Sequence, residues 1–395
     1  MPNVSDSYSH AAPSRQIVGL LAASCGIVVA NIYYSQPLVG LIGRALGMQP
    51  RAESLIVSLT QLGYATGLVF LVPLGDLVEN RRLVVVTVAA ATLPLLLAGF
   101  AWDGPVMLVV SVLIGLTSVA VQMLIPIAAH LTPQASRGRV VGLVTSGLLF
   151  GILFSRPIAS GIAAFTSWRL VFFISAALMA GLAFLLHRAL PYRKPEASHH
   201  YAALLASLFS LPVRFAILRQ RAIYQAAAFS GFSLFWTGIP LFLMHEFGFT
   251  QRGIALFALA GAAGAFSAPV AGHLADRGFT AAGTFSSLVG VMVAFGIAAA
   301  GAAFHSVLVL VLAAIVLDAA VQTSLVLGQR SIYVLAPELR SRMNGIFMAM
   351  FFLGGAVGSA ATGPLLANGS WMELCMAGGL PPLFALVYFC FSAFR

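Results

Sequence analysis

Apolar residues fill twelve long stretches of the chain, and short polar segments separate them. A helix that crosses the hydrocarbon core of a bilayer needs about 20 mostly apolar residues, and each stretch has about that length. We therefore predict an all-α membrane protein with twelve transmembrane helices, at residues 17–41, 53–75, 83–101, 106–130, 139–163, 168–188, 222–245, 252–273, 280–303, 306–329, 342–366 and 371–393.

The composition agrees with a lipid environment. Of the 395 residues, 60% are hydrophobic and 8% are charged, so the apolar side chains cannot all be buried inside a water-soluble globule. Residues 1–16 are polar and lack the pattern of a cleaved signal peptide, and we expect an N-terminal cytoplasmic tail there. Cys25, Cys375 and Cys390 lie inside predicted spans without metal-ligand spacing, so we interpret them as packing residues.

The distribution of basic residues predicts the orientation of the chain. A formal net charge of +10 raises the question of nucleic-acid binding. With the N-terminus in the cytoplasm, however, 16 of the 21 Lys and Arg residues fall on the cytoplasmic side and four on the outer side. This asymmetry indicates a lipid bilayer as partner, and no nucleic acid. We expect a multi-pass protein of the bacterial inner (plasma) membrane with both termini in the cytoplasm.

Three short polar motifs occur twice, in the same order in each half of the chain. The pairs are GDLVENRR (Gly75–Arg82) with GHLADRG (Gly272–Gly278), Arg137-Gly-Arg139 with Arg340-Ser-Arg342, and Ser167-Trp168 with Ser370-Trp371. The repeat predicts two pseudo-symmetric six-helix bundles, residues 17–188 and 222–395, related by an axis along the membrane normal. Between them we expect a cytoplasmic linker, residues 189–221, which either contains an interfacial helix or forms a solvated loop.

With its twelve spans, central linker and paired loops, the chain resembles the major facilitator superfamily over essentially its whole length. Three motifs point to a branch within it. They are NIYYSQPL in the first span, PLGDLVENRR after the second and SRP in the fifth, and they are similar to those of a bacterial efflux branch related to drug:proton antiporters. The resemblance implies the major facilitator fold and a central path lined by the first, fourth, seventh and tenth helices. The fourth span departs from the branch, because Ser111 lies where a membrane arginine is expected.

The resemblance also implies a cytoplasmic latch, in which a loop acid contacts the start of a helix in the opposite half. A carboxylate near a helix N-terminus is stabilised by about 0.3–1 kcal/mol. We expect Glu79 to face the start of the eleventh span, near Arg342 and Asn344. Asp276 is expected to face the start of the fifth span, near Arg139. Alternatively, both acids only solvate a turn. The predicted latch residues are Gly75, Glu79, Arg81, Arg82, Gly272, Asp276 and Arg277.

Asp318 and Arg156 lie within predicted spans, where an ionisable residue costs about 2.5–3.5 kcal/mol on insertion. We predict that Asp318, with Arg156, couples transport to protons, because a carboxyl group in a low-dielectric cavity can hold a proton near neutral pH. The alternative is a purely structural pair of the two residues. Arg156, which precedes Pro157, either binds an anionic substrate group, or instead neutralises Asp318 or bonds to carbonyls that the proline frees.

Other polar and aromatic side chains of the spans are candidates for a substrate site. The alternative role for each of them is a hydrogen bond between helices. We interpret Phe232 as a packing or lipid-facing residue and Gln36 as part of a cavity lining. The predicted substrate-binding residues are Asn31, Tyr34, Gln122, Trp236, Gln322 and Arg156.

The sequence contains no sign of an enzyme. It lacks a phosphate-binding Gly-x4-Gly-Lys-Ser/Thr loop, a nucleophile elbow and a metal-spaced cluster, so we expect no ATP drive and no cofactor. We predict a monomeric, proton-coupled secondary active transporter that exports a small amphiphilic or drug-like compound by alternating access. Proton-coupled uptake of a small organic anion is the alternative hypothesis. A non-transporting membrane receptor or scaffold is the third.

Overall fold

The computed structural model describes residues 13–195, 200–264, 267–336 and 339–393. These residues form α-helices and short 3-10 helices, and no β-strand occurs among them. The prediction of an all-α membrane protein is therefore confirmed. Eight predicted spans are single helices: α5 (Asn80–Phe100), α8 (Gln134–Phe165), α9 (Trp168–Ala189), α11 (Ala216–Glu246), α15 (Thr280–Ala303), α16 (Val307–Tyr333), α17 (Arg340–Asn368) and α18 (Trp371–Ala393).

The other four predicted spans consist of more than one helix. The second contains α3 (Pro50–Glu53), α4 (Leu55–Phe70) and η2 (Val72–Asp76), and the fourth contains α6 (Gly104–Thr117) and α7 (Ala120–His130). Both remain long enough to cross a membrane, so the described residues contain ten such segments. The first and eighth predicted spans are divided into pieces that are too short to cross a bilayer alone.

The first span bends near its middle. Helix α1 (Arg15–Ala30) ends in a turn, and η1 (Gln36–Leu38) and α2 (Val39–Ala45) continue the chain. Pro37 lies in the first turn of η1, and proline has no backbone N–H to donate to the helix. The bend turns Tyr33 and Gln36 toward the middle of the molecule, where both side chains contact α8.

The eighth span consists of α12 (Gln251–Ala258), α13 (Ala260–Gly264) and α14 (Ser267–Asp276). Its glycines let it approach α16 closely. A Cβ atom at Gly261 would collide with the carboxylate of Asp318, and one at Gly264 would collide with the Asp318 Cβ. Only glycine fits at these two positions, because any larger side chain would push α16 away.

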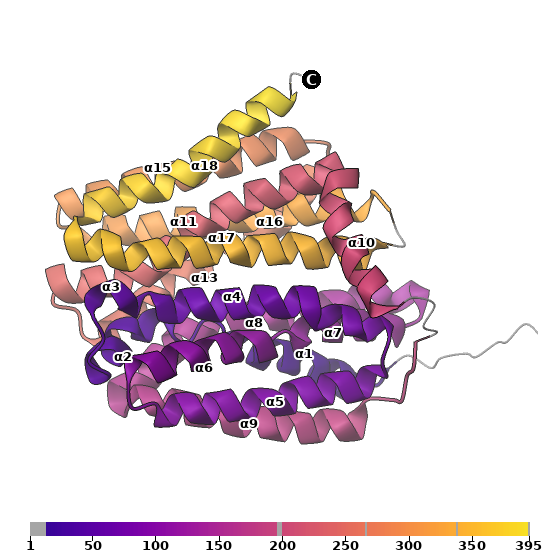
Figure 1. Cartoon of the computed structure of the whole chain (residues 1–395). Helices are drawn as coiled ribbons and strands as arrows, with labels where there is room; N and C mark the ends of the chain where they lie inside the picture. Colours follow the sequence, from indigo (N-terminus) through magenta and orange to yellow (C-terminus); the bar gives the residue numbers. More distant parts are fainter. Residues whose placement is uncertain (1–12, 196–199, 265–266, 337–338, 394–395) are drawn as a thin grey trace, which may run out of the picture.

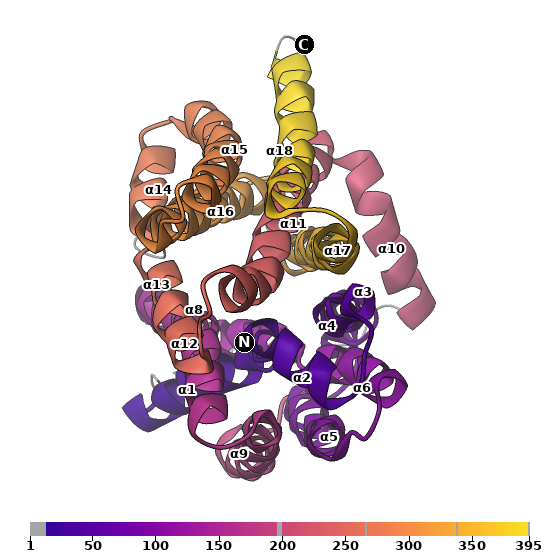
Figure 2. The same ribbon diagram turned by 90° about the vertical axis from the view of Figure 1, so that its left-hand side faces the viewer.

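The helices form two groups, which the figures show as the indigo-to-magenta and the red-to-yellow halves (Figure 1, Figure 2). In the N-terminal group α1 packs on α8, α4 on α6, and α5 on α9. In the C-terminal group α11 packs on α17 and α18, and α15 packs on α16. The groups meet where α4 contacts α17 and α8 contacts α12.

Helix α10 (Tyr201–Arg214) lies across one side of the molecule and contacts both groups (Figure 2). Its buried residues Leu204, Leu208 and Leu211 recur at helical spacing, and the Tyr201 hydroxyl donates to the Phe70 carbonyl at 2.8 Å. The segment predicted as an interfacial helix or a solvated loop is thus helical. Residues 1–12 of the predicted tail and 196–199 of the predicted linker lie outside the described residues.

We call the end of the molecule that carries the loop Gly75–Arg82, α10 and the start of α17 the basic end. At this end the acid that reaches the other group is Asp76, whose carboxylate lies 3.8 Å from the Arg342 guanidinium. Asp276 forms an ion pair with Arg330 of its own group. The predicted pairing of Glu79 with α17, and of Asp276 with the start of α8, differs from the contacts observed.

Glu79 instead binds backbone groups of its own half. Its carboxylate accepts the N–H groups of Arg81 at 2.8 Å, Arg82 at 2.7 Å and Arg193 at 3.1 Å. The first two bonds make Glu79 the N-cap of α5, and the third fastens the start of the linker to this loop. Partial burial raises the pKa of Glu79, but the hydrogen bonds from Arg193, Arg82 and Arg81 outweigh it and lower the pKa below its usual value.

We expect Glu79→Gln to destabilise the protein by about 0.5–2 kcal/mol at neutral pH, because the variant loses a charged N-cap. The native carboxyl has the lower pKa, so its contribution is present above the usual glutamate pKa of about 4.3 and is lost as the pH falls through the lowered pKa. Thermal unfolding of the purified protein in detergent at several pH values measures the difference. The exposed Glu246→Gln is the control, and an effect of Glu79→Gln that grows at acidic pH would contradict the capping role.

Candidate functional site

Arg156 is buried at the centre of the molecule, with 3% of its surface exposed. Its Nε donates to the Gln36 side-chain oxygen at 2.9 Å. Its guanidinium carbon lies 4.4 Å from the centroid of the Trp236 ring, 5.1 Å from that of Phe232 and 5.3 Å from that of Tyr33. Aromatic faces attract cations, so three rings and one amide stabilise this buried charge.

Asp318 is the second buried charge, and 5% of its surface is exposed. The indole N–H of Trp236 donates to its carboxylate at 3.2 Å. Among the described residues, Asp318 and Arg156 form no ion pair within 4.0 Å. Trp236 contacts both charges, because its ring faces Arg156 and its N–H binds Asp318. Arg156 belongs to the N-terminal group, whereas Trp236 and Asp318 belong to the C-terminal group.

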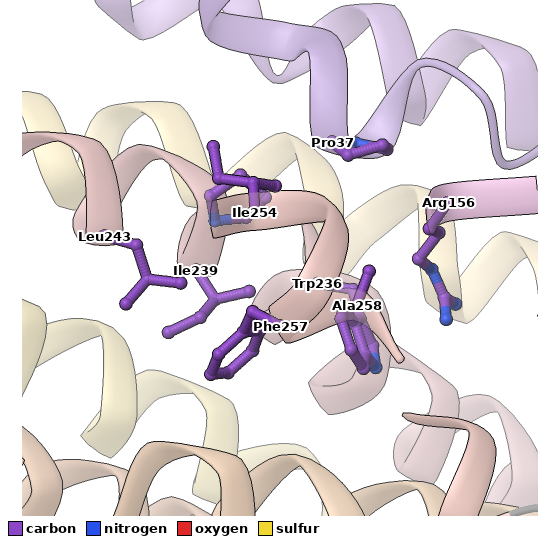
Figure 3. A pocket seen from close by; sticks show the side chains of 9 residues that line it. Pro37, Arg156, Trp236, Ile239, Leu243, Ile254, Phe257 and Ala258 are labelled. Carbon is purple, nitrogen blue, oxygen red and sulfur yellow. The ribbon is translucent and has the colours of Figure 1, made fainter. Parts of the chain in front are cut away.

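A small cavity lies beside Arg156 and Trp236 (Figure 3). Its volume is about 10 Å³, which is room for about one water molecule. Two buried donors near it, Arg156 Nη2 and Gln36 Nε2, have no hydrogen-bond partner among the described residues. The site is thus closed, and it contains two hydrogen-bond donors without a partner among the described residues. The cavity is lined by Pro37, Arg156, Trp236, Ile239, Pro240, Leu243, Ile254, Phe257 and Ala258.

Hydroxyl and amide groups join the two groups next to this centre. The Gln61 amide of α4 donates to Ser233 of α11 at 2.8 Å, and the Ser233 and Ser359 hydroxyls lie 2.5 Å apart. Thr237 donates to Ser359 at 3.4 Å. Of these bonds, the one between Gln61 and Ser233 crosses from one group to the other, and its partners are neutral.

A second polar cluster connects the groups through Gln122. Its amide nitrogen donates to the Tyr64 hydroxyl at 3.5 Å, and its oxygen accepts from Asn344 of α17 at 3.5 Å. Asn344 also accepts hydrogen bonds from Gln329 at 3.2 Å and Tyr333 at 3.0 Å. Gln122 also lines a cavity at the basic end together with Asp76 and Arg193 of the loop and linker.

The structure brings three of the predicted site residues together, namely Arg156, Trp236 and Asp318. Gln322 lies on the next turn of α16, partly exposed. Asn31 accepts from Ser175 at 2.5 Å and donates to Met179, so its polar atoms face α9 and not Asp318.

Tyr34 lies with residues of α8 and α9 along a groove that α1 also lines. Its neighbour Tyr33 contacts Arg156 instead, because the chain leaves the helix after Ala30. Prediction from regular helical spacing therefore missed Tyr33 and did not assign Gln36 to a specific site. Pro37 was the signal in the sequence for this bend.

Comparison with known proteins identifies the family to which the chain is similar. A family model described as Major Facilitator Superfamily matches residues 21–317. The chain is 38% identical to the uncharacterized transporter YgaY of Escherichia coli O157:H7 over 366 residues, which cover 92% of each chain. It is 32% identical to the Streptomyces coelicolor protein named "Probable transporter SCO4007" over 375 residues, 93% of this chain and 85% of the relative.

Among solved structures, the fold is similar to that of a bacterial homologue of the human lysosomal transporter Spinster. The TM-score is 0.76 with 13% identity, and the match covers 96% of each chain. At this low identity, the likeness shows the fold alone.

We expect Gly264→Ala to destabilise the protein by about 1–3 kcal/mol, because the added methyl group would collide with Asp318 and displace α16. Gly296→Ala in α15 is the matched control, since nothing lies within 4 Å of a Cβ at that position. Thermal unfolding followed by tryptophan fluorescence compares the two variants. Equal melting temperatures would show that α13 does not approach Asp318 as closely as described.

Proposed function

Since the chain belongs to the major facilitator superfamily and is a transporter rather than an enzyme, we propose that it is a proton-coupled secondary transporter of a small amphiphilic compound. The contact Arg156–Trp236–Asp318 supports this proposal. Both groups of helices contribute to the contact, so rocking one group against the other must break it. Whatever changes its strength therefore shifts the balance between the closed and open conformations.

Protonation of Asp318 is the change that we propose. A neutral carboxyl group no longer attracts the nearby Arg156, which belongs to the other group. It also accepts a weaker hydrogen bond from Trp236, but that bond lies within the C-terminal group. A proton at Asp318 thus weakens the contact between the groups. Asp318 is the acid of this contact, and its position on α16 agrees with the role in proton coupling that the sequence predicts.

The lining of the small cavity supports an amphiphilic cargo. Ile239, Leu243, Ile254 and Phe257 provide an apolar wall on the C-terminal group, and Arg156 provides the polar contact from the N-terminal group. Because the two sides of the cavity belong to different groups, their separation would enlarge it to accept a ligand. Apolar walls with a few polar groups are typical of small-molecule sites.

Contacts between the groups close both ends of the central site. Asp76 approaches Arg342 at the basic end, and the Gly363 N–H donates to the Ser54 hydroxyl at 3.0 Å at the opposite end. We propose that these contacts open in alternation. The excess of Lys and Arg at the basic end supports its cytoplasmic location and both termini inside the bacterial inner membrane.

Two modes of coupling fit this scheme. Export of an amphiphilic or drug-like compound in exchange for protons is the mode that the sequence resemblance favours. Uptake of a small organic anion together with protons is the second candidate, and the spare donors Arg156 Nη2 and Gln36 Nε2 favour it. In both modes the protein works as a single chain with its own central site.

We expect Asp318→Asn to lower proton-linked flux by at least about a hundredfold, the lower end of the range for loss of a positioned proton-transfer group. The variant should still fold, because an asparagine oxygen can accept the Trp236 N–H. The measurement is the pH change inside proteoliposomes when lipophilic cations, neutral drugs and organic anions are added in turn. Glu246→Gln is the control for loss of an exposed acid. Proton-linked flux retained in folded Asp318→Asn would show that Asp318 is structural.

A further inference from the structure

The wall of the central cavity carries a positive charge. Arg156 lines the cavity, whereas Asp318 is not among the lining residues, because Trp236 and Gly261 cover its carboxylate. Beside the cavity, Arg156 Nη2 and Gln36 Nε2 are donors without a partner among the described residues. The side-chain oxygen of Gln251, whose amide nitrogen donates to the carbonyl of the cavity-lining Pro37, is also without a partner there. Arg156 and Gln36 are fully or almost fully buried. A ligand that satisfies these two donors must bring acceptor oxygens, and a positively charged ligand would be repelled by the guanidinium that lines the cavity.

Few ionisable groups of the described residues lie close to Asp318. Around Asp318, the helices packed on α16 are α11, α13, α14, α15 and α17. Arg156 and the Tyr33 phenol are the charged or titratable groups of the described residues that face the Asp318 carboxylate. The remaining charged and titratable residues of these helices and of α16 lie near the helix ends: Arg219, Arg221, Tyr224, His245, Glu246, His273, Asp276, Arg330, Tyr333, Arg340 and Arg342.

We propose that the cargo is an amphiphilic monocarboxylate, whose oxygens bind Arg156 Nη2 and Gln36 Nε2 and whose apolar body lies against Trp236 and Phe257. We propose further that each carboxylate is carried together with one proton on Asp318. This inference rests on the proton-coupled transport proposed above, and it decides between the two modes in favour of anion–proton cotransport.

The balance of charge links the carboxylate to the proton. When Asp318 is ionised, the charges of Arg156 and Asp318 cancel, and a bound carboxylate would leave one net negative charge in a low-dielectric site. Such an uncompensated charge is costly. When Asp318 is protonated, the carboxylate of the ligand replaces Asp318 as the counter-charge of Arg156, and the site is neutral again. Proton and carboxylate therefore favour each other's binding, and by linkage the effect is reciprocal.

Three probes with the same phenylbutyl body test the inference: phenylbutyrate, phenylbutanol and phenylbutylamine. Calorimetric titration of the full chain in detergent measures their affinities. We expect phenylbutyrate to bind, and to bind about tenfold more tightly at about pH 6 than at about pH 8, because binding is linked to one proton. The alcohol and the amine should bind at least about tenfold more weakly, since they lack a carboxylate for the guanidinium.

Variants add a second readout. Asp318→Asn should bind phenylbutyrate with an affinity that no longer depends on pH, whereas Arg156→Gln should lose the binding. Arg169→Gln is the matched control, because Arg169 also lies over a tryptophan, 4.3 Å from the Trp168 ring centroid, but is located at the start of α9 and does not line the central cavity. The probe series on the unaltered chain tests the inference even if Arg156→Gln does not fold.

In proteoliposomes, phenylbutyrate flux should carry protons and should be insensitive to the membrane potential, because one anion and one proton carry no net charge. The inference is overturned if phenylbutyrate does not bind at either pH, if it binds more tightly at about pH 8, or if the amine binds as tightly. Export of the amine in exchange for protons would overturn this inference and leave the proposed function intact. Phenylbutyrate binding without any proton-linked flux would overturn the proposed function and the cotransport with it.

Discussion

The contact of Trp236 with both Arg156 and Asp318 is the interaction on which the arrangement of the site depends. A buried guanidinium and a buried carboxylate are each costly without a partner, and here one indole serves both. Its face attracts the cation, and its N–H satisfies the anion. Because the arginine comes from one group of helices and the acid from the other, the same contact that stabilises the charges also joins the two groups.

This contact requires irregular helices around it. The bend after Ala30 brings Tyr33 and Gln36 to Arg156, and the division of the eighth span brings Gly261 and Gly264 against Asp318. Irregular backbone inside a membrane is tolerated where protein surrounds it. Both irregular segments lie at the interface of the two groups and so meet this condition.

Away from the charged centre, weaker interactions connect the groups. Gln61 with Ser233, and Gln122 with Asn344, form hydrogen bonds between neutral side chains. At the basic end, Asp76 and Arg342 form a partly exposed ion pair, and such pairs contribute about 0–1 kcal/mol. Contacts of this strength can be broken and formed again during a conformational cycle, whereas the charges at the centre are buried.

The sequence alone determined the fold class and the residue types at the centre. The lengths of the apolar stretches defined the spans, and the cost of burying a charge singled out Asp318 and Arg156. Both signals can be read from the sequence, because neither depends on which residues become neighbours in the folded protein. Only the tertiary structure decided which groups these residues meet. Helical spacing placed Asn31 with Tyr34, and the family resemblance paired Glu79 with α17. The bend near Pro37 turned Tyr33 and Gln36 inward instead, and three backbone N–H groups hold Glu79 in its own half. Contacts between distant segments depend on bends and close approaches that no local pattern encodes.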